Sequence, residues 1–248
     1  MTEPTTSVTS KILAIFDAFS PERPELTLSE LAERTGLTLP TLHRRAAELV
    51  EWGALERTAS SRYRIGLRLW EVGTLAPRGV GLRERALPFL EDLYVVTRQN
   101  VQLAVREGLE LVFVERIAGH GAVPVLTRVG GRFSLHATGV GLALLAHAPT
   151  GVQEAVIGGE LPAYTRFTIT DGERLRRELA EVRHRGYAVS DRMVTDDALS
   201  VAAPVHGPDS EVVAAVSLVT SATDAQPHAL APAVRTAARG ISRALGAR

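Results

Sequence analysis

The chain contains no cysteine among its 248 residues. Disulfide bonds and cysteine-ligated zinc sites are therefore excluded, as expected for a protein that works in a reducing compartment. The 28 basic and 28 acidic residues cancel, so any surface that attracts nucleic acid must be local. No apolar run is long enough to span a bilayer, and the first ten residues are too polar for a signal peptide. We expect a soluble cytoplasmic protein with no membrane partner.

The length and the hydrophobic content of 45% allow a small and a medium-sized domain, each with its own core. The segment 77–81, Pro-Arg-Gly-Val-Gly, interrupts a helical pattern on either side. We therefore expect a first domain over residues 1–76, a linker-helix region over 77–99 and a second domain over 100–248.

Residues 27–65 have the pattern of a winged helix-turn-helix. Thr27 and Glu30 fit a capping box, in which each side chain accepts a hydrogen bond from the other's backbone amide. Gly36, which lacks a Cβ and so tolerates a left-handed conformation, is placed to end that helix and begin the turn. A second helix is expected to begin at the N-cap Thr38, with Pro40 in its first turn.

The second helix has an apolar stripe and a polar face. Leu42, Ala46, Leu49 and Val50 recur at helical spacing and predict the buried stripe. The opposite face is expected to reach DNA, and its candidate DNA-binding residues are Thr38, Pro40, Thr41, His43, Arg44 and Arg45.

Two short strands are expected at 54–57 and 62–65, joined by the turn residues 58–61. Arg57, Arg62 and Arg64 alternate with apolar residues in this wing, so their side chains are predicted to point at phosphates. The alternative is a small helical domain whose arginines merely solvate it. The wing and its arginines favour DNA binding.

The order of these elements resembles the N-terminal domain of the IclR (isocitrate lyase regulator) family of bacterial transcription factors. The resemblance rests on residues 14–19, 28–32, 41–44 and 63–67, and it continues through 125–130, 135–139, 186–189 and 202–205. It implies a homo-oligomer, a dimer or a dimer of dimers, whose partners are double-stranded operator DNA and a small organic acid. Leu39, Pro40 and Arg45 depart from the family's recognition helix, and Leu142 replaces its usual lysine after the pocket glycines.

From residue 101 the hydrophobic period shifts toward two, which indicates a sheet. We expect strands at 101–105, 109–117, 123–129, 187–190, 199–205 and 212–219, and helices at 138–146, 172–185 and 232–245. Hairpin strands mixed with flanking helices indicate an α+β fold. The resemblance implies a GAF-like effector-binding domain, in agreement with this order.

The start of the predicted helix at 138–146 is a plausible anion site. The free amides and positive dipole end of a helix suit a carboxylate, which makes Gly139 and Val140 candidate donors. Hydroxyl and apolar residues whose positions match the family's effector-binding segments complete the set of candidates: Thr138, Gly139, Val140, Asp191, Ala198, Ser200 and Ser217. The alternative is that Thr138 only caps the helix and that the two serines are ordinary small strand residues.

Three features suggest enzyme chemistry, and each is incomplete. Gly139 and Gly141 lack the third glycine and the acidic residue of a dinucleotide site. Asp191 and its neighbours have no histidine pair at metal-ligand spacing, and Ser134 lacks the flanking glycines of a nucleophile elbow. We expect no catalytic residue, no metal and no cofactor.

The sequence thus predicts a DNA-binding transcriptional regulator, a repressor rather than an activator, of a catabolic operon controlled by a small organic or aromatic acid. The alternative is an enzyme or small-molecule sensor built on the second domain, with a vestigial DNA-binding domain. A further alternative is a second domain that has lost effector binding and serves only for dimerisation.

Overall fold

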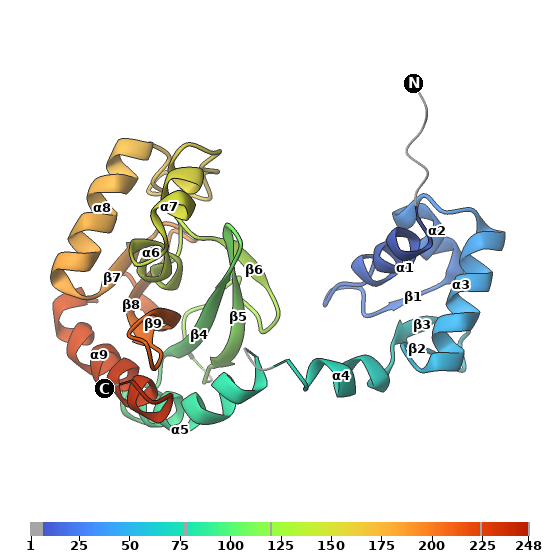
Figure 1. The fold of residues 1–248 in the computed structure, drawn as a ribbon, viewed down its shortest axis with the longest axis horizontal. Helices are drawn as coiled ribbons and strands as arrows, with labels where there is room; N and C mark the ends of the chain where they lie inside the picture. The colour runs from blue at the N-terminus through green and yellow to red at the C-terminus, as the bar shows by residue number, and fades with distance from the viewer. Residues whose placement is uncertain (1–6, 77–78, 120, 224, 248) are drawn as a thin grey trace. The chain divides into compact units, whose positions relative to one another are not determined.

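The computed structural model describes residues 7–76, 79–119, 121–223 and 225–247. The chain forms two compact units, Met1–Pro77 and Arg78–Arg248 (Figure 1). Each has its own buried apolar core, as the hydrophobic content predicts. No helix in the described part of the chain is both long enough and apolar enough to cross a membrane.

The N-terminal unit is built from helices and a small sheet. Its elements are α1 (Val8–Asp17), β1 (Glu25–Leu26), α2 (Leu28–Thr35), α3 (Leu39–Trp52), β2 (Leu55–Arg57), β3 (Tyr63–Ile65) and α4 (Leu67–Gly73). The capping box at Thr27 and Glu30 is present, and Gly36 ends α2 in the left-handed region with φ 67°. Both predictions are confirmed.

The wing sheet has the order β1-β3-β2 and is antiparallel. The two-residue strand β1 was not predicted, because two residues show no period in a sequence. Leu42, Ala46 and Leu49 of α3 are buried with Leu55 and Tyr63, whereas Val50 is half-buried. Ile65, expected to pack inward, is exposed.

The C-terminal unit contains a six-stranded antiparallel sheet of order β6-β5-β4-β9-β8-β7. Its strands are β4 (Asn100–Glu107), β5 (Glu110–Ile117), β6 (Arg132–Ser134), β7 (Ala188–Asp191), β8 (Ala198–His206) and β9 (Val212–Ser221). Its helices are α5 (Val80–Thr97), α6 (Gly139–Ala146), α7 (Thr150–Ile157), α8 (Gly172–Arg185) and α9 (Pro227–Ala244).

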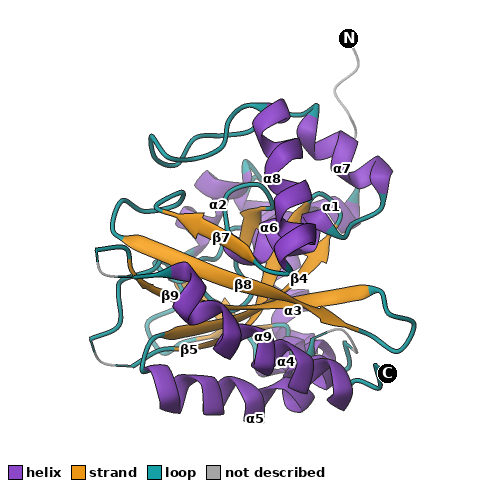
Figure 2. Cartoon of the chain, turned by 90° about the vertical axis from the view of Figure 1, so that its left-hand side faces the viewer, coloured by secondary structure: helices purple, strands orange, loops and turns teal. Residues whose placement is uncertain are grey.

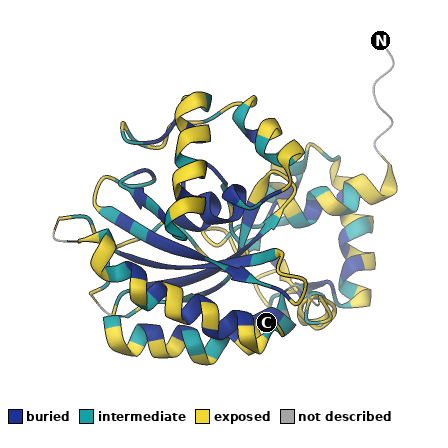
Figure 3. Cartoon of the chain, turned by 60° about the vertical axis from the view of Figure 1, so that its left-hand side comes forward, coloured by how far each residue is buried: buried dark blue, intermediate teal, exposed yellow. Residues whose placement is uncertain are grey.

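Helices cover both faces of this sheet (Figure 2). Helices α5 and α9 pack against one face, while α6, α7 and α8 form the other layer. All eight residues of α6 are buried, so this short helix is surrounded by protein (Figure 3). Alternation along the strands sends Val101 and Leu103 to the α5 side, and Gln102 therefore faces the α6 side.

Two predictions for this unit are wrong, and one helix was not predicted. Residues 123–129 do not form a strand, because Pro124 removes an amide donor and the side chains of Asn100 and Arg116 bind the segment's carbonyl groups instead. Helix α7 was missed, and α9 begins at Pro227 rather than at residue 232. A proline is well accommodated in the first turn of a helix, so Pro227 does not interrupt α9.

Candidate functional site

The first half of α3 carries the polar face predicted to reach DNA. His43 and Arg44 are exposed, and the described residues offer Arg44 no carboxylate partner. Thr38 is the N-cap residue, but its hydroxyl donates to Thr41 Oγ1 at 3.0 Å instead of accepting from a helix amide. Pro40 lies in the first turn, as predicted.

Arg45 does not lie on the open face as expected. It is half-buried, and its Nη1 donates to both carboxylate oxygens of Glu48, at 2.7 and 3.0 Å. Its buried Nε has no hydrogen-bond partner in the described part of the chain. The guanidinium group of Arg45 is thus paired within α3, whereas that of Arg44 is exposed.

The wing arginines differ from one another in their partners. Arg62 Nη2 donates to Glu30 Oε2 at 2.9 Å, so the capping-box carboxylate also ties the wing to α2. The pKa of Glu30 is held below its ordinary value, first by the amide of Thr27 and then by the Thr27 hydroxyl. We expected Arg62 to point at a phosphate, but in this structure it points at Glu30.

The other two wing arginines lie on the exposed part of the hairpin. Arg64 pairs with Glu56 through Nη2 at 2.7 Å, and this contact is the largest cause of the lowered pKa of Glu56. Arg57 donates only to the hydroxyl of Ser61, at 3.2 Å, within the described residues. Arg57 is therefore the wing arginine whose charge is least compensated.

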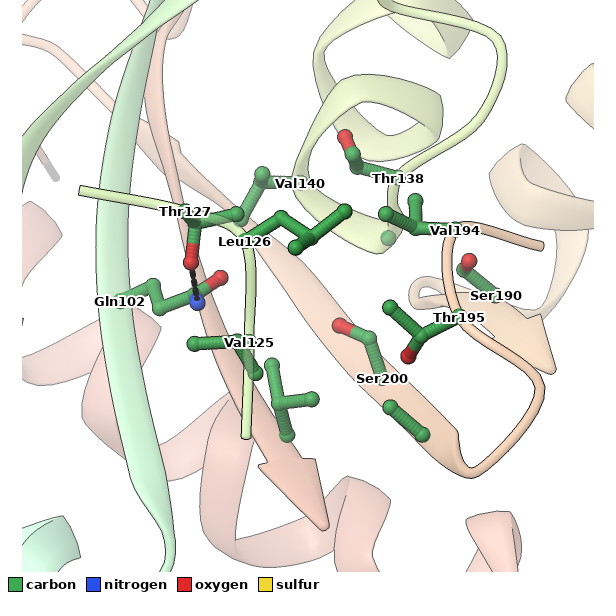
Figure 4. A pocket seen from close by; sticks show the side chains of 13 residues that line it. Gln102, Val125, Leu126, Thr127, Thr138, Val140, Ser190, Val194, Thr195 and Ser200 are labelled. Carbon is green, nitrogen blue, oxygen red and sulfur yellow. Dashed lines mark hydrogen bonds between the residues drawn. The ribbon is translucent and has the colours of Figure 1, made fainter. Parts of the chain in front are cut away.

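A cavity of about 40 Å³ lies between the sheet and the N-terminus of α6 (Figure 4). Five of the predicted effector residues line it: Thr138, Gly139, Val140, Ala198 and Ser200. Thirteen residues line it altogether, and none of them carries a formal charge.

The α6 end of the cavity supplies backbone donors. Thr138 caps the helix, because its Oγ1 accepts from the amide of Gly141 at 3.0 Å. The amides of Gly139 and Val140 precede the first intrahelical hydrogen bond and so have no acceptor within the helix. A Cβ on residue 139 would lie 2.6 Å from Ser200 Oγ and 3.2 Å from Ser200 Cβ, so the glycine allows this helix end to approach β8 closely.

Two predicted effector residues do not line the cavity. Asp191 follows Ser190 on β7, and alternation turns it to the other face of the sheet, where it pairs with Arg192 at 2.9 Å. Ser217 is on the correct face but is fully buried, and its hydroxyl donates to Gln102 Oε1 at 3.4 Å. Ser217 therefore binds the Gln102 side chain and does not itself line the cavity.

The remaining walls come from two loops that the sequence did not identify. The first is residues 123–127, which we call the strap. Asn100 Nδ2 donates to the carbonyl of Val123 at 2.8 Å, and Arg116 Nη1 donates to that of Thr127 at 3.4 Å. Leu126 of the strap lines the cavity although it is 66% exposed. The strap is therefore a thin wall between the cavity and solvent.

The second loop contributes Val194 and Thr195. The hydroxyls of Thr165 and Thr168 donate to the carbonyls of Arg192 and Met193, each at 2.6 Å, and hold this loop in place. Ser190, also part of the lining, donates to the carbonyl of Ala137 at 2.9 Å. Nothing in the spacing of these residues indicates a shared cavity, because they come together only through the sheet topology.

Two family descriptions match the chain. The IclR helix-turn-helix domain matches residues 8–59, and the C-terminal domain of the bacterial transcriptional regulator IclR matches residues 76–243. The chain belongs to the IclR family of bacterial transcriptional regulators. Its function as a DNA-binding transcriptional regulator and its α+β fold are thereby confirmed.

Individual relatives extend over nearly the whole chain. It is 34% identical over 241 residues to the HTH-type transcriptional regulator KipR of Bacillus subtilis, covering 95% of this chain and 96% of KipR. It is 30% identical over 229 residues to the glycerol operon regulatory protein of Streptomyces coelicolor, covering 90% of this chain and 89% of that protein.

Among solved structures, the chain is similar to that of an IclR homologue from Microbacterium hydrocarbonoxydans complexed with 4-hydroxybenzoate. The TM-score is 0.92 at 36% identity, covering 96% of this chain and 99% of that one.

Proposed function

We propose that this regulator represses a catabolic operon and is released from its operator by a small organic acid, an aromatic acid in particular, bound in the cavity at α6. The observation that carries this proposal is the position of the Gly139 and Val140 amides at the helix end that borders a neutral cavity. The IclR homologue complexed with 4-hydroxybenzoate supports the choice of an aromatic carboxylate.

Backbone amides suit a carboxylate in such a place. Two adjacent N–H groups at a helix N-terminus donate to an anion, and the helix dipole adds to the attraction. The Ser200 hydroxyl is half-buried on the cavity wall and has no hydrogen-bond partner among the described residues, so it is free to donate as well. The apolar side chains of Val140 and Ala198 then contact the ring or chain of the acid.

The cavity is suited to binding rather than catalysis. None of its thirteen lining residues titrates near neutral pH, so it offers no general acid, general base or activated nucleophile. We therefore propose a regulatory role, exercised in the cytoplasm where operator DNA is accessible.

On the DNA side, we propose that α3 enters the major groove. Thr41, His43 and Arg44 reach base edges or flanking phosphates, and Thr38 and Pro40 lie at the helix end that approaches the DNA backbone. Arg57 contacts a phosphate from the wing. Arg45, Arg62 and Arg64 contribute by positioning these elements through their carboxylate partners.

We propose that the regulator binds a pseudo-palindromic operator as a homodimer paired through α4. No residue of α4 is buried, and Leu67 and Trp70 are 62% and 67% exposed. A contiguous apolar surface of this kind is usually covered by a partner. Trp70→Glu should raise the dimer dissociation constant, as sedimentation velocity would measure, whereas an unchanged dimer would contradict the use of α4.

The test of the main proposal measures both sites together. The operator is located by footprinting upstream of the chain's own gene and its neighbours, and its affinity is measured by fluorescence anisotropy with and without 4-hydroxybenzoate. Coupling of about 1 to 3 kcal/mol would lower operator affinity roughly 5- to 150-fold. If 4-hydroxybenzoate saturates the protein, as shown by calorimetry, and operator affinity stays the same, the proposed release mechanism is wrong.

A further inference from the structure

Gln102 and Thr127 form a second polar part of the cavity wall, on the side away from Ser190 and Ser200 in the view of Figure 4. Gln102 of β4 lies there and is only 3% exposed, an unusual position for an amide side chain. Its Nε2 donates to Thr127 Oγ1 of the strap at 2.5 Å, and its Oε1 accepts from the Ser217 hydroxyl. The amide is therefore held in one orientation from both sides.

Gln102 and Thr127 each retain a hydrogen-bond donor that the other does not use. An amide nitrogen carries two hydrogens, and only one of them is bound to Thr127. The described residues supply no second acceptor for Nε2. Thr127 accepts from Gln102 through its hydroxyl oxygen and so keeps its own hydrogen to donate. This end of the cavity thus presents two donors that a bound oxygen would satisfy.

The position of Thr127 is fixed independently of Gln102. Arg116 donates to the Thr127 backbone carbonyl and, through Nη2, to Asn100 Oδ1 at 3.1 Å, while Asn100 holds the carbonyl of Val123. The strap is therefore fastened at both of its ends. Such bracing from a second layer of side chains is what a recognition site requires.

We propose that Gln102 and Thr127 recognise a neutral oxygen, a hydroxyl or a carbonyl, at the end of the effector remote from its carboxylate. This inference rests on the proposed function, because it assumes that the carboxylate lies at α6. A second carboxylate at this end would meet neither a cationic side chain nor a helix N-terminus, and burying an unpaired charge is costly. The effector class is thus a monocarboxylic acid with a distal neutral oxygen.

The test compares three probes that share a ring: benzoate, 4-hydroxybenzoate and terephthalate. Calorimetry on the full chain should show 4-hydroxybenzoate binding about 10-fold or more tighter than benzoate, since a site that donates hydrogen bonds discriminates against an analogue that lacks the acceptor. Terephthalate should bind no tighter than benzoate.

Variants of Gln102 and Thr127 then test whether these residues cause the preference for 4-hydroxybenzoate over benzoate. In Gln102→Met and in Thr127→Val, the ratio of the two affinities should fall toward about 1, because each variant removes a donor. Thr236→Val, an exposed change on α9 outside the cavity lining, should keep the wild-type ratio. If both acids weaken equally and the ratio survives in both cavity variants, the two residues are merely structural and the inference is wrong.

The remaining outcomes separate this inference from the proposed function. If benzoate and 4-hydroxybenzoate bind the wild type equally and both release DNA, the second polar end has no role, but the proposed function stands. Tighter binding of terephthalate than of benzoate would also overturn the inference alone. If none of the three acids binds, the proposed effector class is wrong, and this inference fails with it.

Discussion

Each of the two units is proposed to bind an anion, but the two binding surfaces differ in charge and in exposure to solvent. On α3 the cation of Arg44 projects into solvent, and the wing adds the lightly paired Arg57. The cavity at α6 contains no charged side chain and offers only amides, hydroxyls and the Gln102 side chain.

An anion can thus be bound either by charged side chains in solvent or by uncharged donors in an enclosed site. A phosphate in water is attracted over several ångströms by guanidinium groups, and this attraction is weakened by salt. A carboxylate in an enclosed site is bound at short range by oriented dipoles, which need no counterion. Operator affinity should therefore fall steeply with salt, while effector affinity should change little.

Filling the cavity is expected to have the largest effect on effector binding. Ser200→Leu removes a hydroxyl and adds a bulky side chain at a residue that lines the cavity, so we expect effector affinity to fall at least about 100-fold, or roughly 2.7 kcal/mol. Calorimetry with 4-hydroxybenzoate would measure it. Ser217 is unsuitable for this test, because a larger side chain at a fully buried position would disturb the sheet.

Ser200→Ala is the matched control, since it removes the hydroxyl without adding bulk. It should cost only about 0.5 to 1.5 kcal/mol of effector affinity. Both variants should bind the operator as tightly as the wild type when no effector is present. If Ser200→Leu keeps wild-type effector affinity, the acid binds elsewhere.

The next largest effect is expected on the DNA side. Arg44→Ala should lower operator affinity by about 1 to 3 kcal/mol if the guanidinium reads a guanine. Anisotropy at a fixed salt concentration would measure this loss. Arg34→Ala changes an exposed arginine of α2 whose Nε is bonded to the carbonyl of Ala18, and it serves as the comparison. Equal affinities for Arg44→Ala and the wild type would remove Arg44 from the interface.

Among the wing arginines, ion pairing separates those available for DNA from those that brace the fold. Arg57→Ala should reduce the slope of log affinity against log salt by about 1, as expected for one lost phosphate contact. Arg62→Ala should leave that slope unchanged, because its charge is bound to Glu30. A smaller slope for Arg62→Ala would show that Arg62 leaves Glu30 for a phosphate.

The smallest expected effect is the loss of folding stability at acid pH caused by the buried His136. Burial lowers the pKa of His136, and the hydrogen bond to the carbonyl of Pro162 only partly opposes this shift. Because the unfolded chain takes up the proton at the ordinary pKa near 6.5, stability is complete above that pH and decreases as the pH falls below it.

The urea midpoint of the C-terminal unit should therefore fall between about pH 7.5 and pH 5.5, and His136→Gln should flatten this dependence. His184→Gln, at an exposed position, should not. An identical pH dependence in the wild type and His136→Gln would show that another group controls acid sensitivity.

The sequence was most informative where neighbours along the chain determine structure. The capping box at Thr27 and Glu30, the left-handed Gly36 and the cap at Thr138 are local features with local physical causes. The strap was not predictable in this way. Its alternating apolar residues match a strand pattern, but Pro124 and the distant donors Asn100 and Arg116 hold it in another conformation.

The candidate site shows the same division. Gly139 and Val140 were found because a helix N-terminus can be read from sequence, whereas Gln102 gave one weak signal, a polar residue at an inward position of an apolar strand. Asp191 was misplaced because a family segment does not by itself fix which face of a strand a residue occupies.

If the effector binds in the cavity as proposed, the strap also limits how quickly the regulator can respond. A molecule in the cavity is separated from solvent by one thickness of chain, whose ends are fastened by Asn100, Gln102 and Arg116. Departure requires some of these hydrogen bonds to break, so the residence time of the effector follows the opening rate of the strap rather than diffusion. Loosening one fastening, as in Asn100→Ala, should shorten that residence time and, under the proposed function, let repression resume sooner once the acid is exhausted.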